Sequence, residues 1–313
     1  MSSLNQIKKE SVSVILPAYN EAGSIAVAAE KSVKALKDNL YEGEVIVIND
    51  GSFDNTKAEA ERVSSKYPNV RIIDHKNNEG LTNALLTGFR NAKGEIIVFL
   101  CADLQSDPEE DIPKLLNEIK NGYDVVLGWR QGRKNRIFVS KIGHLLCQLF
   151  FGVSLHDMNW IKAFKREVVN DLPLRSDWHR YIAILANAAG HKITEVKTNY
   201  YPRKHGKSKF GKKRIIISLL ALLTIKFQIS FMRRPMFFFG TLGFIFLGLG
   251  IILGFGLLIL VIYTSFTIQP AKAWYILLLL LFIVGLNFFS LGFLAEFMVT
   301  INEKLKSLDK SKD

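Results

Sequence analysis

Short apolar runs alternate with segments of helical spacing over the first hundred residues of the chain. This alternation predicts strands and helices in turn. The predicted strands are residues 12–19, 44–50, 70–75 and 95–100, and the predicted helices are residues 24–40, 55–66 and 79–92. Strands that are apolar along their whole length and separated by helices predict an α/β fold with a mainly parallel central sheet covered on both faces.

The pattern changes after residue 213. Residues 214–232 are apolar but interrupted by a lysine and a glutamine, and basic residues flank them, which predicts an interfacial helix. Residues 236–263 and 273–299 are each long and apolar enough to cross a bilayer as transmembrane helices. We therefore expect two domains, residues 1–213 and a membrane domain of residues 214–313 that ends in a short tail.

The chain has a formal net charge of +12, and much of the excess lies between residues 203 and 234, directly before the apolar segments. A basic region beside a predicted membrane segment favours contact with anionic membrane lipids over binding to nucleic acid. We therefore expect membrane lipids, and no nucleic acid, among the partners.

Charge also predicts the topology of the membrane domain. The tail, "NEKLKSLDKSKD", carries four lysines, and the connector between the two predicted spans carries one. The positive-inside rule then predicts that both termini and the first domain are cytoplasmic. The N-terminus lacks the apolar core of a signal peptide, and the two cysteines exclude a disulfide framework, so both observations favour a reducing compartment.

Polar side chains follow three of the predicted strands. The first strand ends in "PAYNE", the second in Asn49 and Asp50, and the fourth is followed by Asp103 and Gln105. Ligands of open parallel sheets bind beyond the carboxyl ends of the strands, so these groups predict a ligand site at one edge. Ordinary turn chemistry explains any one of them equally well.

A further segment, residues 136–153, has apolar residues at helical spacing and one polar side. Two interpretations stay open, because a helix packed on the sheet and a helix lying at the membrane surface share this pattern.

Six motifs lie within residues 11–212: "SVILPAYNE", "VIVINDGSFDNT", "NEGLTNALLTGF", "GEIIVFLCADLQSDPE", "DVVLGWR" and "YYPRKHGKSKFG". As a set they resemble the family 2 glycosyltransferases, inverting enzymes with a GT-A nucleotide-sugar fold. Within that family they look like the polyprenyl-phosphate (dolichyl-phosphate) mannosyl- and glucosyltransferases. The bactoprenol glucosyltransferases and the lipid A aminosugar transferases are similar in the same motifs. Related proteins include oligomers, so the resemblance leaves a homo-oligomer open.

The resemblance implies roles on the donor side. The nucleotide-sugar-binding residues would be Pro17, Ala18, Tyr19, Glu21, Asp50, Gly80, Asn83 and Asp103. Asp103 and Gln105 would coordinate Mg²⁺ or Mn²⁺ bridging the donor diphosphate, as hard cations take oxygen ligands.

Cys101 departs from the usual family pattern, Asp-x-Asp-x-Gln, because it stands at the first acidic position. A thiol is a poor ligand for Mg²⁺. Asp103, Gln105 and diphosphate oxygens would still complete a shell, so we expect a functional but weaker metal site.

The acceptor side requires cations. A lipid monophosphate has a second pKa of about 6, so at neutral pH it is largely a dianion and needs placement rather than a strong base. The implied phosphate-binding residues are Arg130, Arg203, Lys207, Ser208 and Lys209. Asp157 matches the acid of another family segment and would orient the acceptor or the sugar, and with Asp103 and Arg130 it completes the expected catalytic set. Asn159, Trp160 and Ile161 depart from the small residues usual in that segment, and a packed aromatic is an open interpretation of Trp160. The resemblance places His179 and Arg180 near the sugar or the phosphates, and a structural role of His179 stays equally open.

These expectations combine into one hypothesis: a membrane-anchored enzyme that transfers a hexose from a UDP- or GDP-sugar to polyprenyl phosphate with inversion. Two alternatives stay open, a processive polysaccharide synthase and a catalytically inactive membrane protein that binds nucleotide sugars. A Rossmann dehydrogenase is excluded, because no Gly-x-Gly-x-x-Gly follows the first strand.

Overall fold

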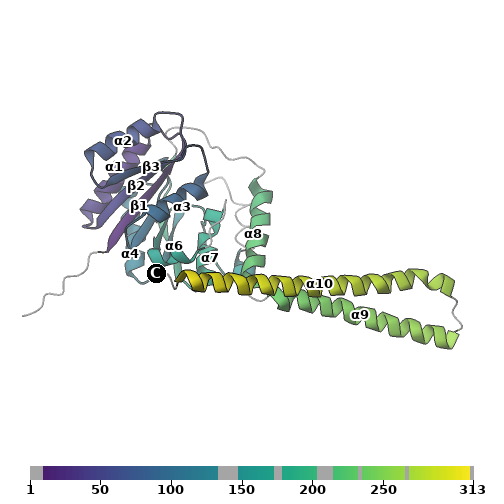
Figure 1. The fold of residues 1–313 in the computed structure, drawn as a ribbon. Coiled ribbons are helices and arrows are strands. Elements are labelled where there is room, and N and C mark those ends of the chain that lie inside the picture. Colours follow the sequence, from purple (N-terminus) through teal and green to yellow (C-terminus); the bar gives the residue numbers. More distant parts are fainter. Residues whose placement is uncertain are drawn as a thin grey trace, which may run out of the picture. The chain divides into compact units, whose positions relative to one another are not determined.

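The computed structural model describes residues 10–132, 147–172, 178–202, 214–231, 235–264 and 268–310. Its contacts divide the chain into two units, Met1–Leu219 and Leu220–Asp313, which are described separately (Figure 1). The division falls inside the helix that begins at Arg214, the residue after the predicted boundary at residue 213.

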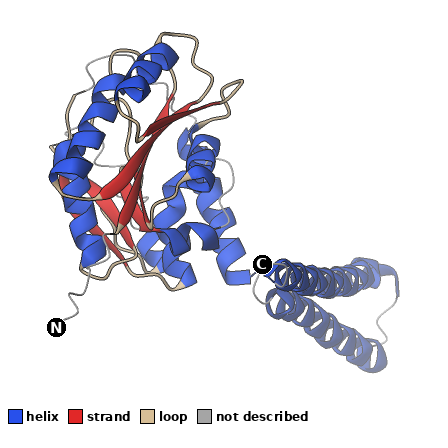
Figure 2. Ribbon diagram, turned by 60° about the vertical axis from the view of Figure 1, so that its left-hand side comes forward, coloured by secondary structure: helices blue, strands red, loops and turns tan. Residues whose placement is uncertain are grey.

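A seven-stranded sheet forms the centre of the first unit (Figure 2). The strands are β1 (Ser11–Ala18), β2 (Glu42–Asn49), β3 (Val70–Asp74), β4 (Ile96–Phe99), β5 (Val125–Gln131), β6 (Lys162–Lys165) and β7 (Ile193–Asn199). Their order is β3-β2-β1-β4-β6-β5-β7. Among these strands only β6 runs antiparallel to its neighbours, so the predicted mainly parallel sheet is confirmed.

Helices connect most of the strands. They are α1 (Ile25–Asp38), α2 (Thr56–Lys66), α3 (Leu81–Asn91), α4 (Pro108–Lys120), α6 (Arg166–Asp171), the 3₁₀ helix η1 (Trp178–Tyr181) and α7 (Ile182–Ala189). The strands and helices predicted for the first hundred residues are confirmed to within two residues at each end. Most of residues 136–153, the segment with two open interpretations, lies outside the described part of the chain.

Helices cover both faces of the sheet, which explains the continuous apolar strands. Val14 of β1 belongs to the apolar cluster that also contains residues of α1 and α4. The next residue, Ile15, faces the opposite side because successive side chains alternate along a strand. There α3 approaches so closely that a Cβ at Gly88 would lie 2.5 Å from Ile15 Cγ2.

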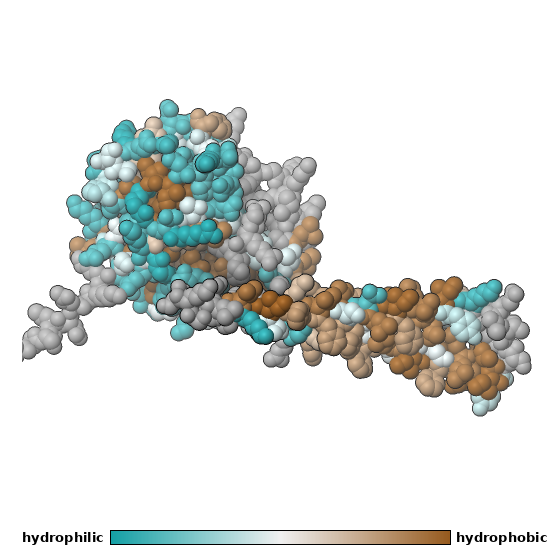
Figure 3. All heavy atoms as spheres, viewed as in Figure 1, coloured by the Kyte–Doolittle hydropathy of each residue, from teal (hydrophilic) through white to brown (hydrophobic). Residues whose placement is uncertain are grey.

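The second unit is built from long apolar helices. Helix α8 (Arg214–Phe231) begins before the division, and α9 (Pro235–Thr264) and α10 (Ile268–Lys310) pack against each other. Two candidate spans, Pro235–Tyr263 and Lys272–Ile301, have mean hydropathies of 3.0 and 2.5, and their surfaces are mostly apolar (Figure 3). They match the two predicted transmembrane segments in place and length.

Glycines bring α9 and α10 close together at one point. A Cβ at Gly243 would lie 2.9 Å from the carbonyl oxygen of Gly285, and a Cβ at Gly285 would lie 3.1 Å from the carbonyl oxygen of Gly243. The two helices therefore pack closely here, as small residues allow. Gly248 and Gly256 have no neighbour within 4 Å, so they take no part in this contact.

Glu296 joins the same two helices at another point. Its carboxylate accepts a hydrogen bond of 3.2 Å from the backbone N–H of Met236, in the first turn of α9. The first N–H groups of a helix lack partners within it and carry partial positive charge, so a carboxylate there is favourable.

Asp111 of α4 is a buried acid without a hydrogen bond to its carboxylate oxygens. The nearest cation, the ammonium of Lys114, lies 3.9 Å away. Burial raises the pKa of Asp111 to about 7. The folded state therefore holds a proton at this position that the unfolded chain releases near pH 4.

This proton predicts how stability depends on pH. The stability that the protonated Asp111 contributes is fully present below about pH 4 and is lost as pH rises through about 7. The free energy of unfolding of the full chain in detergent should therefore fall by roughly 2–3 kcal/mol between pH 5 and pH 8. Asp111→Asn should remove most of this slope, as measured by guanidinium titration at several pH values.

Asp124 provides a control, because the fold lowers its pKa whereas it raises the pKa of Asp111. Burial raises its pKa, but hydrogen bonds from Lys165 and from the backbone of Lys192 lower the pKa overall. Asp124→Asn should therefore destabilise the chain at pH 8 and leave the slope due to Asp111 in place. An unchanged slope in Asp111→Asn would contradict the assignment.

Candidate active site

The candidate site lies at the carboxyl edge of the sheet, where the loops after β1, β2, β4 and β5 emerge. The segment before β6 reaches the same edge because β6 is antiparallel. Lys162, the first residue of β6, pairs with Phe99, the last residue of β4. Residues 157–161 therefore lie beside the loop that carries Asp103.

Hydrogen bonds connect the turn after β1 to the turn after β2. Asn20 adopts a left-handed backbone conformation with φ of 53°, which Asn tolerates better than most residues. Its N–H donates to Ser52 Oγ at 2.9 Å, and its side-chain oxygen accepts from the N–H of Phe53 at 3.0 Å. The N–H of Glu21 donates to Thr56 Oγ1 at 2.8 Å. The predicted "PAYNE" residues are thus fixed against the "NDGS" turn.

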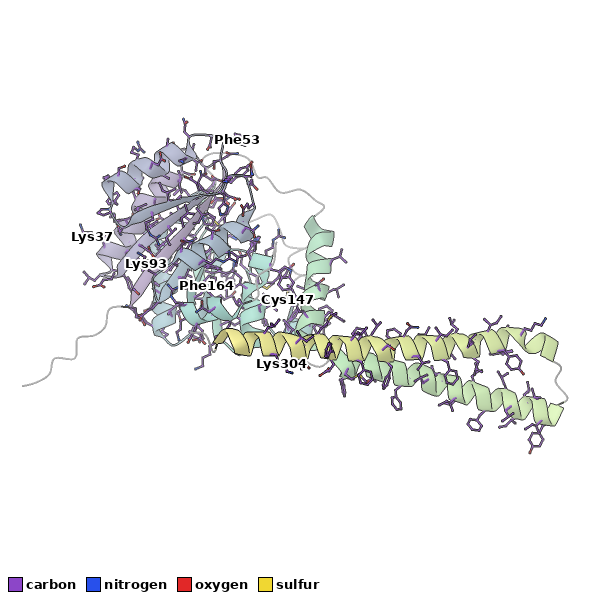
Figure 4. The ribbon with its side chains drawn as sticks, in the orientation of Figure 1. Lys37, Phe53, Lys93, Cys147, Phe164 and Lys304 are labelled. Carbon is purple, nitrogen blue, oxygen red and sulfur yellow. The ribbon has the colours of Figure 1, made fainter. Side chains whose placement is uncertain are left out.

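Phe53 stands at the tip of the turn after β2 (Figure 4). Its side chain is 83% exposed, and its ring meets that of Tyr19 edge to face, with centroids 6.0 Å apart. Ala18, also predicted to bind nucleotide, is buried, and its carbonyl accepts from the N–H of Asp50 at 2.9 Å.

Asp50 organises the loop before α3. Its carboxylate accepts hydrogen bonds of 2.9 Å from the N–H groups of Glu79 and Gly80, and it contacts His75 Nδ1 at 2.8 Å. Gly80 has a φ of 87°, a conformation that favours glycine. Asn83 donates to the carbonyl of Glu79 at 3.1 Å. Three predicted nucleotide-binding residues, Asp50, Gly80 and Asn83, are therefore brought together.

The loop after β4 presents the candidate metal ligands. Asp103 is buried, and its Oδ1 accepts from the N–H of Gln105 at 3.2 Å. Between them, Leu104 has a φ of 54°, which costs free energy for a non-glycine residue. The Gln105 amide nitrogen donates to the Tyr200 hydroxyl at 2.7 Å, and the Gln105 carbonyl accepts from Tyr201 N–H at 3.0 Å. These bonds tie the loop to the end of β7.

Within the described ranges no group of three or more His, Cys, Asp or Glu side chains is arranged to hold a metal ion. The Asp103 carboxylate and the Gln105 amide oxygen supply two hard ligands. That set fits a cation that takes the rest of its shell from substrate oxygens and water, as Mg²⁺ does.

Arg130, near the end of β5, forms a two-pronged ion pair with Asp157. Arg130 Nη2 donates to Asp157 Oδ1 at 2.8 Å, and Arg130 Nε donates to Oδ2. The guanidinium carbon lies 4.4 Å from the centre of the Trp160 ring, whose Nε1–H donates to Thr198 Oγ1 at 3.2 Å. Trp160 is a packed aromatic, as the sequence indicated, and it is also the surface on which Arg130 rests.

Lys162 was not predicted as a site residue. Its side chain is 1% exposed, and its ammonium donates to the carbonyl of Trp160 at 2.7 Å. Burial lowers the pKa of Lys162 to about 8, although the nearby Asp157 and Cys101 raise it. The available signal was a lysine inside the apolar run "WIKAF".

The other predicted positions divide into two groups. His179 is buried and bonds through Nδ1 to Thr82 Oγ1 at 2.8 Å, which links η1 to α3 and agrees with a structural role. The remaining predicted phosphate-binding residues lie outside the described residues: Arg203, Lys207, Ser208 and Lys209.

Comparison with known proteins identifies the family. The glycosyl transferase family 2 profile matches residues 13–172. Dodecaprenyl-phosphate galacturonate synthase of Rhizobium johnstonii is 32% identical over 76% of this chain and 72% of its own length. Undecaprenyl-phosphate 4-deoxy-4-formamido-L-arabinose transferase of Pseudomonas fluorescens is 30% identical over 92% of this chain and 84% of its own. The transferase of that name from Proteus mirabilis is 29% identical over 98% and 93%.

Solved structures agree on the fold. Glucosyl-3-phosphoglycerate synthase of Mycobacterium tuberculosis, in a complex with Mn²⁺ and UDP, superposes with a TM-score of 0.56 and 21% identity, over 69% of this chain and 80% of that one. With a family match over half of its length and relatives aligned over three quarters or more of it, this chain belongs to glycosyl transferase family 2.

Proposed function

We propose that this chain transfers a sugar from a nucleotide-sugar to the phosphate of a polyprenyl phosphate, with inversion at the anomeric carbon. The observation that carries the proposal is the length of the similarity. A relative named for an undecaprenyl-phosphate acceptor aligns along 98% of the chain, which necessarily includes both long apolar helices. An acceptor with a long apolar tail agrees with such helices.

The reaction follows from the charge of the two substrates. An oxygen of the lipid phosphate attacks the anomeric carbon while the bond from that carbon to the donor diphosphate breaks, and the nucleoside diphosphate leaves. The attacking phosphate is largely a dianion at neutral pH, so no strong base has to remove a proton. Both oxygens of Asp157 accept from Arg130, which fixes the orientation of the guanidinium.

Among the predicted phosphate-binding residues, Arg130 is the one that lies in the described part of the chain, and we propose that it binds the acceptor phosphate. A guanidinium offers several N–H donors in one plane, and Asp157 and the Trp160 ring use only part of its surface. We extend the acceptor site to Arg203, Lys207, Ser208 and Lys209, on the strength of the basic motif alone. We also propose that the first unit and both termini are cytoplasmic, as the lysine distribution favours.

On the donor side, the fastened turns after β1 and β2 and the loop held by Asp50 form the proposed nucleotide site. Asp103 and Gln105 would hold Mg²⁺ or Mn²⁺, which when bound neutralises the departing diphosphate. The relatives named above carry different sugars, so we leave the sugar open and propose UDP or GDP as the leaving group.

The proposal is tested by transfer in the purified, detergent-solubilised full chain. Undecaprenyl phosphate would be offered with UDP-glucose, UDP-GlcNAc, UDP-galacturonate or GDP-mannose in turn, with Mn²⁺ or with EDTA. We expect one of these donors to give a lipid-linked sugar when Mn²⁺ is present and none when EDTA is present. Asp103→Asn should lower turnover roughly 100-fold or more, because the diphosphate loses its metal.

Asp38→Asn, an exposed acid at the end of α1, is the matched control and should leave turnover unchanged. Binding of a nucleotide without transfer to lipid under any condition would contradict the proposal. That outcome would favour the alternative of a catalytically inactive protein. The observation in favour of this alternative is that Cys101 stands where the family usually has an acidic metal ligand.

The Cys101 position gives a second prediction. A carboxylate there would add a hard ligand beside Asp103, so Cys101→Asp should tighten Mn²⁺ binding roughly tenfold, about 1.4 kcal/mol. Titration of the free Mn²⁺ signal by electron paramagnetic resonance, with UDP present, measures this. Cys101→Ser is the control and should leave the affinity near that of the natural chain. Equal affinities in all three proteins would place residue 101 outside the metal shell.

A further inference from the structure

Lys162 is among the largest fully buried side chains in the described residues, and it is a charged one. A lysine is almost never fully buried unless it is paired, because removing an ammonium from water is costly. Its described hydrogen bonds amount to one, to the carbonyl of Trp160 at 2.7 Å, and its Nζ lies 5.7 Å from the centre of the Phe99 ring. The structure therefore accepts a desolvated cation at this point.

The position of Lys162 relates it to the acceptor side of the site. It begins β6, directly after the segment that carries Asp157 and Trp160. Through the Trp160 carbonyl it holds the residue on whose ring Arg130 rests. The ionisable groups that act on its charge are Asp157, Cys101 and Arg130. Lys162 thus lies between the loop after β4 and the Arg130–Asp157 pair.

Packing alone does not explain a lysine here. The Trp160 ring is already held by its own bond to Thr198 and by burial in the apolar cluster, so the packing of the ring does not need a lysine. A methionine would fill a similar volume without the cost of desolvation. What the lysine adds is charge.

The positive charge of Lys162 matters because the negative charge of Asp157 would otherwise cancel the positive charge of Arg130. Both Asp157 oxygens bond to that guanidinium, so the two side chains together are neutral. With the ammonium of Lys162 nearby, two cations act against one carboxylate. The cluster then keeps an excess positive charge in a poorly solvated place, where an incoming anion is attracted strongly.

We propose that Lys162 is a positioning residue of the acceptor site, holding the 157–160 segment through the Trp160 carbonyl and offsetting the charge of Asp157 so that Arg130 can receive the lipid phosphate. This inference rests on the proposed function, since the anion it names is the polyprenyl phosphate. It requires no contact between Lys162 and the substrate.

The test uses the full chain in detergent and variants at position 162. Lys162→Met should weaken binding of geranyl phosphate, a short polyprenyl phosphate, roughly tenfold in calorimetric titration without donor, and should lower kcat/KM for undecaprenyl phosphate by a similar factor. The KM for the nucleotide-sugar should change less than roughly threefold. Lys162→Arg, which keeps the charge, should recover most of both losses.

A double variant separates charge from packing. If Lys162 acts by offsetting Asp157, then Asp157→Asn combined with Lys162→Met restores the excess positive charge. The double variant should bind geranyl phosphate several times more tightly than Lys162→Met alone, a coupling that independent sites would not show.

Lys165→Met is the matched control. Lys165 ends the same strand and bonds to Asp124 at 2.7 Å, away from Arg130 and Asp157. Its loss should leave geranyl phosphate affinity unchanged while lowering the thermal unfolding temperature. Equal phosphate affinity in Lys162→Met and the natural chain, or no coupling in the double variant, would overturn the inference. Absence of transfer in the natural chain would instead count against the proposed function, because the binding titration needs no turnover.

Discussion

The backbone pairing of β6 is the interaction on which the candidate active site depends. This four-residue strand runs against the direction of β4 and β5 and is hydrogen-bonded to both. A parallel strand in the same place would start at the opposite edge of the sheet. Because β6 is reversed, the residues that precede it, with Asp157 and Trp160, arrive at the edge where Asp103 and Arg130 already lie.

Much of the fold was predictable from the sequence because its signals are local. The strands β1 to β4 are continuous apolar runs, and the helices between them repeat with the period of a helix, so their limits were found within two residues. The reversal of β6 was not predictable. Its sequence, "KAFK", is too short to carry a period, and its direction is decided by partners such as Phe99 and Val125, which are far away in the sequence.

The candidate site likewise has some features with local sequence signals and others that depend on the fold. The position of Asp50, Asp103 and Gln105 at one edge was predictable because they follow recognisable strands, and a parallel sheet brings the strand ends together. The burial of Lys162 and the contact of the Trp160 ring with Arg130 were not predictable, because both depend on neighbours that only the fold brings together. The roles of all the predicted site residues, including those in the basic motif at 203–209, stay predictions.

The balance of charge gives Cys101 a meaning beyond the lost metal ligand. It lies near Lys162, so the carboxylate that the family usually has at this position would be a second acid beside the ammonium. With a thiol at this position, Asp157 is the one carboxylate among the described groups that act on the charge of Lys162. By our proposal, the replacement that removes a hard metal ligand also leaves more net positive charge beside it for an incoming anion. A site that joins two anionic substrates needs positive charge from some source, and in this chain the buried lysine supplies part of what the metal position gives up.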